Sequence, residues 1–272
     1  MNTAGEKPEK TVIVSGATFG IGHEMALYLA RSGFRVVGFG LEKAPVSSVA
    51  EASVADLNSA VKAEGLSAEF VAGDVTSESD VERAVSKALE YGDGIFGLVN
   101  NAAIGPLGTI LDTQPDLFMR IMEVNLKGSY LMARAVIPHM RERGGGRIVN
   151  IGSGAGWGKP NMAAYSTSKG GLVALSKAMA LDHFADGVAV NTVIPGGGGI
   201  ISGMSLGRVA GDQEKLQSKA IGTVAGRIMN GSDMAGAVRF LLSEEAAAIS
   251  GTIIDVGCFA HQGSSTPLPR RA

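Results

Sequence analysis

The sequence contains a single cysteine, Cys258, and this scarcity excludes several kinds of site. One thiol cannot form a disulfide within the chain, and it cannot supply a zinc site that needs several thiolates. It is also consistent with a reducing compartment. The four histidines are scattered along the chain, and none of them adjoins an obvious nucleophile.

Neither sign of charge dominates, since 24 Lys and Arg residues face 26 Asp and Glu residues and the formal net charge is −2. This balance gives no electrostatic reason to expect nucleic acid or an anionic membrane as a partner. The chain also lacks an apolar stretch long enough to cross a membrane. Residues 1–10 are polar and lack the apolar region of a secretory signal. We therefore expect a cytoplasmic protein with no nucleic-acid or membrane partner.

Glycine, in contrast, is abundant: its 39 residues are about twice the usual share. Many backbone segments must therefore turn tightly or approach another group closely. A chain of 272 residues is long enough for one large α/β domain, and no linker divides it. We predict a single domain over residues 1–272, with flexible ends at 1–10 and 263–272.

Short β-branched runs alternate with longer helical patterns through most of the chain. Ser77 and Ser232 are expected to cap helices, and Pro138 is expected to end or bend one. The predicted strands are residues 11–14, 34–39, 70–72, 97–99, 147–151, 188–194 and 252–256. The predicted helices are residues 21–31, 54–62, 77–90, 115–124, 127–141, a long helix that reaches about 184, and 232–242.

This alternation predicts parallel strands covered by helices on both faces, joined by right-handed crossovers. The predicted fold class is α/β, a single doubly wound Rossmann domain with a parallel seven-stranded sheet. Residues 196–228 are glycine-rich and only loosely patterned. We interpret them as a substrate loop or lid, although an ordinary surface excursion fits the same pattern.

A glycine turn follows the first predicted strand. Gly16, Gly20 and Gly22 lie between that strand and a helix, where a pyrophosphate can rest on backbone N–H groups. Side chains at these positions would hold the phosphate away. The spacing differs from the common G-x-G-x-x-G fingerprint, so the turn alone could equally be an ordinary tight turn.

Tyr165 and Lys169 are four residues apart on a predicted helix and therefore share one face. A free tyrosine, with a pKa near 10, is only about 0.1% ionised at neutral pH and is a poor base. A lysine ammonium nearby and the positive charge of an oxidised nicotinamide would both favour the phenolate. Lowering the pKa by roughly three units takes about 4 kcal/mol, which two close cations could supply.

Several further short motifs follow the glycine turn in a fixed order. Asn100-Asn101-Ala102-Ala103 resembles an Asn-Asn-Ala-Gly motif, with Ala103 in place of glycine, and Ser15 stands where threonine is more usual. Together the motifs resemble the short-chain dehydrogenase/reductase family from about residue 11 to residue 257. The resemblance rests on G-x-x-x-G-I-G at residues 16–22, Asp74-Val75, Asn100–Ala103, Asn125, Ser153, Tyr165-x-x-x-Lys169 and Pro195-Gly196.

The resemblance implies an NAD(P)-dependent oxidoreductase acting on a secondary alcohol or ketone. We hypothesise that Tyr165 exchanges the substrate's hydroxyl proton while Ser153 binds the substrate oxygen. The family further implies that Lys169 holds the nicotinamide ribose and that Asn125 anchors a water. The Ser153–Tyr165 separation is one residue shorter than is usual. The expected cofactor contacts are Gly16, Thr18, Phe19, Gly20, Ile21, Gly22, Gly40, Leu41, Asp74, Val75, Asn101, Ala102, Tyr165, Lys169, Pro195 and Gly196.

The choice between NAD and NADP depends on the end of the second strand. An acidic residue there would hold the ribose hydroxyls of NAD, whereas arginine would accept the phosphate of NADP. Gly40 occupies the usual acidic position and Leu41 the usual arginine position, so neither signal is present. Glu42 and Lys43 favour opposite choices. The missing cations favour NAD slightly.

The expected substrate is a small apolar molecule, because the segments next to the proposed site residues are rich in large apolar side chains. These are Trp157, Met162, Ile200, Ile201 and Met204. The extra glycines after Pro195 shift the register of the family's Pro-Gly-x-Ile-x-Thr contact, where Ser202 could replace the threonine. The resemblance also implies a homotetramer or homodimer and no metal at the reaction centre.

Two other functions remain open on the sequence alone. The shortened serine spacing and the altered Pro-Gly loop are compatible with a nucleotide-binding regulatory or scaffold protein that has no redox turnover. Isomerase or dehydratase chemistry at the same site is a third, weaker alternative.

Overall fold

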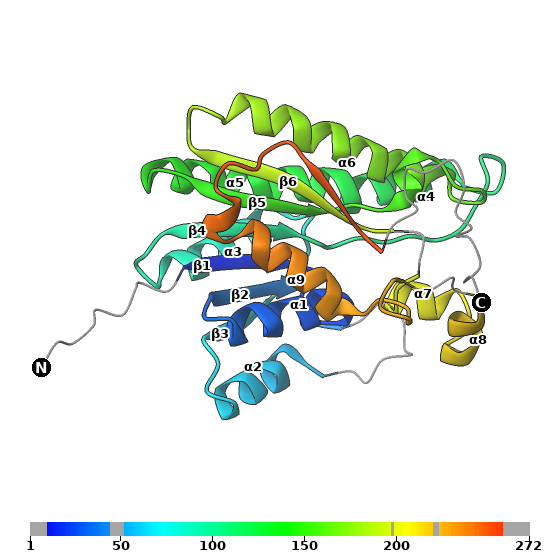
Figure 1. Cartoon of the computed structure of the whole chain (residues 1–272), viewed down its shortest axis with the longest axis horizontal. Coiled ribbons are helices and arrows are strands. Elements are labelled where there is room, and N and C mark those ends of the chain that lie inside the picture. The colour runs from blue at the N-terminus through cyan, green and yellow to red at the C-terminus, as the bar shows by residue number, and fades with distance from the viewer. Residues whose placement is uncertain (1–9, 44–51, 197–198, 220–222, 258–272) are drawn as a thin grey trace, which may run out of the picture.

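A computed structural model describes residues 10–43, 52–196, 199–219 and 223–257. Seven parallel strands form one sheet in the order β3-β2-β1-β4-β5-β6-β7 (Figure 1). This confirms the predicted fold class and all seven strands. The strands are β1 (Thr11–Ser15), β2 (Arg35–Gly40), β3 (Ala68–Ala72), β4 (Ile95–Asn100), β5 (Gly146–Ile151), β6 (Val188–Pro195) and β7 (Ile253–Val256).

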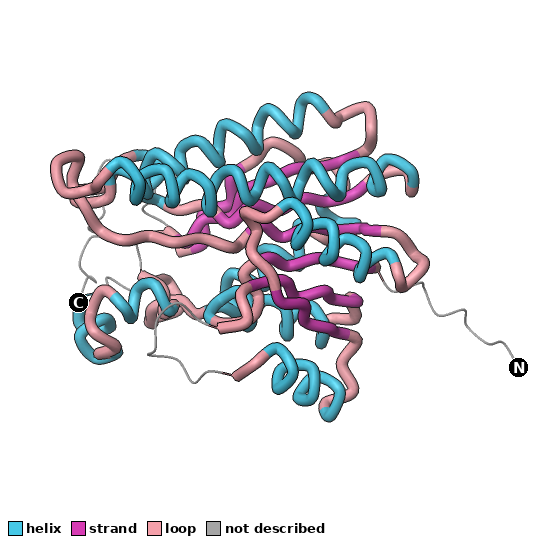
Figure 2. The backbone as a smooth tube through the Cα atoms, turned by 180° about the vertical axis from the view of Figure 1, so that it is seen from behind, coloured by secondary structure: helices cyan, strands magenta, loops and turns pink. Residues whose placement is uncertain are grey.

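Helices cover both faces of the sheet, as Figures 1 and 2 show from opposite sides. One core packs α1, α2 and α9 against the sheet, and the other packs α3, α5 and α6. The helices are α1 (Gly20–Arg31), α2 (Val54–Ala63), α3 (Glu78–Leu89), α4 (Pro115–Met122), α5 (Gly128–Glu142), α6 (Ala163–Asp182), α7 (Gly203–Gly207), α8 (Gln213–Lys219) and α9 (Gly231–Leu241).

Two local predictions about helices are corrected. Pro138 does not end a helix, because α5 continues to Glu142 and buries Val136, Ile137 and Met140 around it. That burial outweighs the hydrogen bond that proline cannot make. Asn230, not Ser232, caps α9, and its Oδ1 accepts from the backbone N–H groups of residues 232 and 233.

The ends of the chain were predicted to be flexible. Lys10 is instead held, since its Nζ hydrogen-bonds Glu244 and lies 4.2 Å from the centre of the Phe96 ring. Residues 1–9, 263–272 and Cys258 lie outside the described residues. The predicted loop over residues 196–228 contains two short helices, α7 and α8, beyond the carboxyl ends of the strands (Figure 1).

The chain adds β2 and β3 on one side of β1 and then crosses to the other side of β1, where β4 to β7 follow. The point between β1 and β4 is therefore the topological switch point of the sheet. In open α/β sheets a ligand binds in the crevice at the carboxyl ends of such a pair. The glycine turn follows β1, and Asn101 follows β4. The fold therefore brings both motifs to the crevice.

Candidate active site

Asn101 fixes the glycine turn to the end of β4. Its Nδ2 donates to the backbone oxygens of Ser15 and Gly16, each at 3.1 Å. In return, Ser15 Oγ accepts from the backbone N–H groups of Asn101 and Ala102, at 3.1 and 3.2 Å. Ser15 therefore joins the two strand ends from the position where threonine is more usual. The side-chain amide of Asn101 shapes the turn, and its expected contact with the cofactor stays a prediction.

The three glycines of the turn serve different purposes. A Cβ on Gly16 would lie 2.7 Å from the Cα of Ala102, and one on Gly22 would lie 2.0 Å from the oxygen of Gly16. Both positions are closed by the protein's own backbone, so packing alone demands glycine there. Gly20, with φ of +63°, faces open space, and the nearest atom to its Cβ position is the nitrogen of Gly203 at 4.0 Å.

The start of α1 has the properties of an anion site. Phe19 occupies the cap position without a side-chain hydrogen bond, and the first turn carries no acidic residue. The first N–H groups of a helix lack partners within it and carry partial positive charge. Thr18 Oγ1 is buried and has no hydrogen-bond partner among the described residues. An orphaned hydroxyl beside open N–H groups fits a phosphate ligand.

The end of β2 has no space for an acidic side chain. A Cβ on Gly40 would lie 2.8 Å from Thr18 Oγ1. Leu41 is 38% exposed, and Glu42 accepts a hydrogen bond from the backbone of Val54 at 3.1 Å. Glu42 is therefore engaged with the start of α2. An acidic side chain at position 40 would therefore require the Thr18 side chain to shift.

Asp74, expected beside an adenine, is already bonded within the protein. Its Oδ1 accepts from the N–H and the hydroxyl of Thr76, at 2.9 and 2.8 Å, and its Oδ2 accepts from Arg120 at 3.0 Å. Burial opposes ionisation of Asp74, but these bonds outweigh it and the pKa of the carboxyl lies below its ordinary value. Val75 is buried, with its side chain against Gly128.

Tyr165 and Lys169 lie together near the start of α6. Both are buried, with 8% and 3% of their surface exposed, and Lys169 Nζ lies 5.9 Å from the centre of the Tyr165 ring. Lys169 Nζ donates to the backbone oxygen of Ile151 at 2.7 Å, which ties α6 to the end of β5. The predicted pairing on one helix face is therefore present in the structure.

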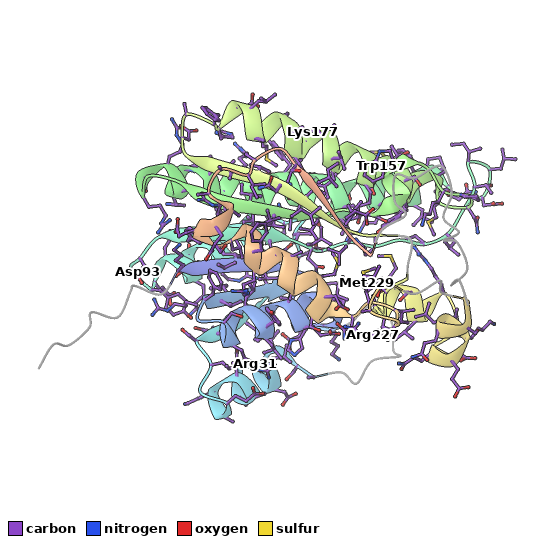
Figure 3. All side chains as sticks on the ribbon, in the orientation of Figure 1. Arg31, Asp93, Trp157, Lys177, Arg227 and Met229 are labelled. Atoms are coloured by element: carbon purple, nitrogen blue, oxygen red, sulfur yellow. The ribbon has the colours of Figure 1, made fainter. Side chains whose placement is uncertain are left out.

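Ser153 reaches Tyr165 despite the shortened spacing in the sequence. Its side chain lies close enough to the Tyr165 side chain to lower the pKa of the phenol, and its Oγ accepts from the N–H of Ala155 at 3.1 Å. A 3₁₀ turn, Gly154–Trp157, leads from Ser153 towards α6, and Figure 3 labels Trp157 at its end. This compact turn takes up the missing residue.

Burial controls the proton affinity of both side chains. It raises the pKa of Tyr165, while the hydrogen bond with Ser153 and the charge of Arg208 lower it. Burial also lowers the pKa of Lys169 to about 8. The sequence predicts a lowered pKa for Tyr165 in the presence of an oxidised nicotinamide, whereas in the protein alone burial raises this pKa. The cation that opposes this effect of burial is Arg208.

Replacing Lys169 with methionine is expected to stabilise the fold at neutral pH. Below pH 8 the folded chain holds a buried ammonium, whereas above 10.5 the lysine is neutral in both states. The penalty is thus fully present below 8 and disappears as pH rises to 10.5. At about 1.4 kcal/mol per pH unit, it amounts to about 3 kcal/mol. Denaturant unfolding of both proteins across this range measures it, and a difference independent of pH would contradict it.

Asn125 lies where the helix of α4 and α5 widens into a π-helical turn, Glu123–Lys127. Such turns occur often at functional sites. Its Oδ1 accepts from the N–H of Ile104 at 2.8 Å, and its Nδ2 donates to Ile104 O and to Ser168 Oγ, each at 2.9 Å. Asn125 therefore joins the segment after β4 to α6. A water held by Asn125 stays a prediction.

Pro195 and Gly196 end β6 at the same edge of the sheet, and Gly196 N–H donates to Val256 O at 2.7 Å. Gly197 and Gly198 of the glycine run lie outside the described residues. Ser202, a candidate for the family's threonine, caps α7, with its Oγ accepting from Ser205 N–H at 3.1 Å. Its hydroxyl is therefore already used within the loop.

Arg208, which follows α7, was not predicted as a site residue. Its guanidinium carbon lies 5.8 Å from the centre of the Tyr165 ring, and Nη2 donates to Gly105 O at 3.0 Å. No local motif marks this arginine, because 43 positions separate it from Tyr165 and a loop brings the two together. Its presence in the predicted substrate loop was the only available signal.

The described part of the chain contains no helix that is both long and apolar enough to span a bilayer.

Comparison with known proteins identifies relatives along nearly the whole chain. The family model for short chain dehydrogenases matches residues 10–204. A 2-(S)-hydroxypropyl-CoM dehydrogenase from Xanthobacter autotrophicus is 35% identical over 264 residues, covering 95% of this chain and 97% of that protein.

The human dehydrogenase/reductase SDR family member 4 is 34% identical over 251 residues, which are 91% of this chain and 86% of the human one. Among solved structures, a variant of actinorhodin polyketide ketoreductase with NADPH matches with a TM-score of 0.82 and 29% identity, over 93% of this chain and 98% of that one. The chain belongs to the short-chain dehydrogenase/reductase family of oxidoreductases, which use NAD or NADP.

Proposed function

We propose that the protein interconverts a secondary alcohol and a ketone, with Tyr165 as the acid and base. The observation that carries this proposal is the burial of Tyr165 and Lys169 together on α6, with Lys169 Nζ 5.9 Å from the centre of the Tyr165 ring and Ser153 close enough to lower the pKa of Tyr165. Tyr165, Ser153 and Lys169 lie at the carboxyl ends of the strands, where the glycine turn also lies. Membership of an oxidoreductase family supports the same reaction class.

Bound NAD(P) would supply the hydride acceptor or donor. In the oxidation direction, Ser153 donates a hydrogen bond to the substrate oxygen and holds it at the phenol. Tyr165, as the phenolate, takes the hydroxyl proton as the carbonyl forms. Lys169 places a positive charge near the phenolate and so favours the ionised form that accepts the proton. The buried setting excludes bulk water, which strengthens each of these interactions.

We further propose that the start of α1 and Thr18 hold the pyrophosphate of the cofactor. The open N–H groups and the orphaned hydroxyl support this assignment. At the adenosine end, the absence of a cation at Gly40 and Leu41 supports a slight preference for NAD. The similar ketoreductase structure contains NADPH, so the two cofactors need a direct comparison.

A panel of apolar secondary alcohols, assayed with NAD and with NADP at the absorbance of the reduced nicotinamide, tests this function. We expect turnover with at least one alcohol class and a lower KM for NAD than for NADP. Tighter binding of NADP would overturn the cofactor preference alone. Measurable cofactor binding without reduction across the panel would favour a nucleotide-binding protein without redox activity.

We also propose that copies of this chain associate through the outer face of α4, α5 and α6. An open apolar depression lies there, and Met119 and Tyr130 on its wall are 54% and 47% exposed. Side chains of this size rarely stay exposed in a cluster unless a partner covers them. The depression is lined by Met119, Met122, Glu123, Leu126, Lys127, Tyr130, Gly171 and Leu175.

A further inference from the structure

The segment that carries Arg208 is anchored over the site at two points. At one point, Ile200 pairs with Met229, the latter labelled in Figure 3, and the N–H of Met229 donates to Gly199 O at 3.0 Å. At the other, α7 rests on Gly105. A Cβ on Gly105 would lie 2.5 Å from Met204 Sδ and 3.1 Å from Arg208 Nη2. The position of Arg208 therefore depends on a glycine that leaves room for it.

This anchoring places a second cation at Tyr165. Lys169 is buried beneath the surface, whereas Arg208 keeps an exposed side chain and reaches the ring from the loop. The charge of Arg208 opposes the rise that burial causes in the pKa of the Tyr165 phenol. A group bound by Arg208 would therefore lie next to the atoms that exchange the proton.

Toward the described residues, most of the hydrogen-bonding capacity of Arg208 is unused. A guanidinium has five N–H donors. Only the bond from Nη2 to Gly105 O uses one of them within the described residues, and no carboxylate there pairs with the guanidinium. Arg120 and Arg227, in contrast, each pair with an aspartate at 3.0 and 2.7 Å. Asp212, on the same loop, instead accepts from the N–H of Lys215.

We propose that Arg208 binds an anionic substituent of the substrate, a carboxylate in the simplest case, within a few bonds of the reacting carbon. A planar guanidinium fork matches the two oxygens of a carboxylate, and such charge-assisted bonds are strong. The proposal rests on the proposed function and narrows its substrate to hydroxy acids or keto acids. Their remaining carbon chain would contact the apolar side chains of the loop, such as Met204.

The test compares 3-hydroxy acids with their methyl esters, which have the same carbon skeleton without the charge. We expect the wild-type enzyme to favour the acid in kcat/KM. In Arg208→Gln the ratio of acid to ester should fall about 10- to 100-fold, since a charged hydrogen bond is lost. Arg208→Lys should recover part of the ratio. Arg239→Gln, an exposed arginine on α9, is the matched control and should keep the ratio.

Two outcomes would overturn the proposal. An equal loss for acid and ester would mean that Arg208 acts only on the Tyr165 proton or on the loop. A wild-type preference for the ester would mean that no anion site exists. The pH profile of kcat/KM reports the other role separately: loss of the Arg208 charge should move the tyrosine limb to higher pH equally for acid and ester, whereas loss of an anion contact lowers kcat/KM for the acid alone.

A binding measurement keeps this inference separate from the proposed reaction. Calorimetric titration of a short saturated carboxylate into the complex of protein and NADH requires no turnover. Binding by wild type and its loss in Arg208→Gln would support the anion site even if no alcohol is oxidised. Absence of carboxylate binding to wild type, while the esters are oxidised, would refute the anion site and leave the oxidoreductase function intact.

Discussion

Replacing Tyr165 with phenylalanine is expected to lower kcat/KM by between about 10² and 10⁴-fold, the usual range for loss of a general acid or base. The ring stays in place, so packing in the site changes little, while the hydroxyl proposed to exchange the proton is removed. Cofactor affinity should stay within about twofold, because the phenol is not part of the phosphate site.

Tyr28→Phe is the matched control for this substitution. It lies on α1, where its ring packs on the core, and it should retain full activity. Turnover by Tyr165→Phe at the wild-type rate would remove Tyr165 from the mechanism. A parallel loss of cofactor affinity and of thermal stability would instead show that the hydroxyl matters for structure.

Replacing Gly22 with alanine is expected to destabilise the fold by about 3 kcal/mol or more, near the upper end for overpacking. The added Cβ would lie 2.0 Å from the oxygen of Gly16 and 2.3 Å from Asn101 Nδ2. Both are parts of the turn's own framework, so α1 would have to move away from β1. Cofactor binding should be lost along with stability, and denaturant unfolding measures the first effect.

Gly236 provides the contrasting substitution. It lies inside α9, and no atom comes within 4 Å of its Cβ position. Gly236→Ala should therefore stabilise the protein by about 0.5–1 kcal/mol through helix propensity. If Gly22→Ala kept wild-type stability and lost only cofactor affinity, glycine would be required at position 22 for ligand binding and not for packing within the protein.

The architecture could be predicted because it depends on periodic patterns. Each strand is a short run of β-branched residues, and each helix buries one stripe, as Met25, Ala26 and Leu29 do on α1. The prediction failed where a tertiary contact decides the outcome. Pro138 breaks a helix in isolation, but the buried side chains around it hold α5 together. The cap of α9 similarly falls on Asn230, two residues before the predicted serine.

Only part of the site could be anticipated from spacing. Residues four apart on a helix must share a face, so the proximity of Tyr165 and Lys169 followed directly. The pKa values of the two side chains could not be anticipated from the spacing, because they depend on how deeply the fold buries each group. The motif favours a tyrosine of lowered pKa, whereas in the folded protein burial raises the pKa of Tyr165 and lowers that of Lys169 to about 8.

Contacts made across the fold explain the remaining differences. Asp74 carries a recognisable motif, yet its carboxylate is bound to Arg120 from α4. Gly22 was explained by the approach of a phosphate, but the structure closes that position with the Gly16 backbone. Arg208 belongs to no motif and reaches Tyr165 only because α7 packs on Gly105. None of these pairs is visible in local spacing.

The most direct test of the proposed reaction follows the hydrogen on the carbinol carbon. A secondary alcohol deuterated at that carbon is oxidised by the wild-type enzyme, and the reduced nicotinamide is analysed by mass spectrometry. We predict one deuterium per turnover on the nicotinamide ring, and with Tyr165→Phe the labelled cofactor should form about 10²- to 10⁴-fold more slowly. Deuterium released to water, or a cofactor that stays unlabelled while the alcohol is consumed, would contradict the proposed hydride transfer.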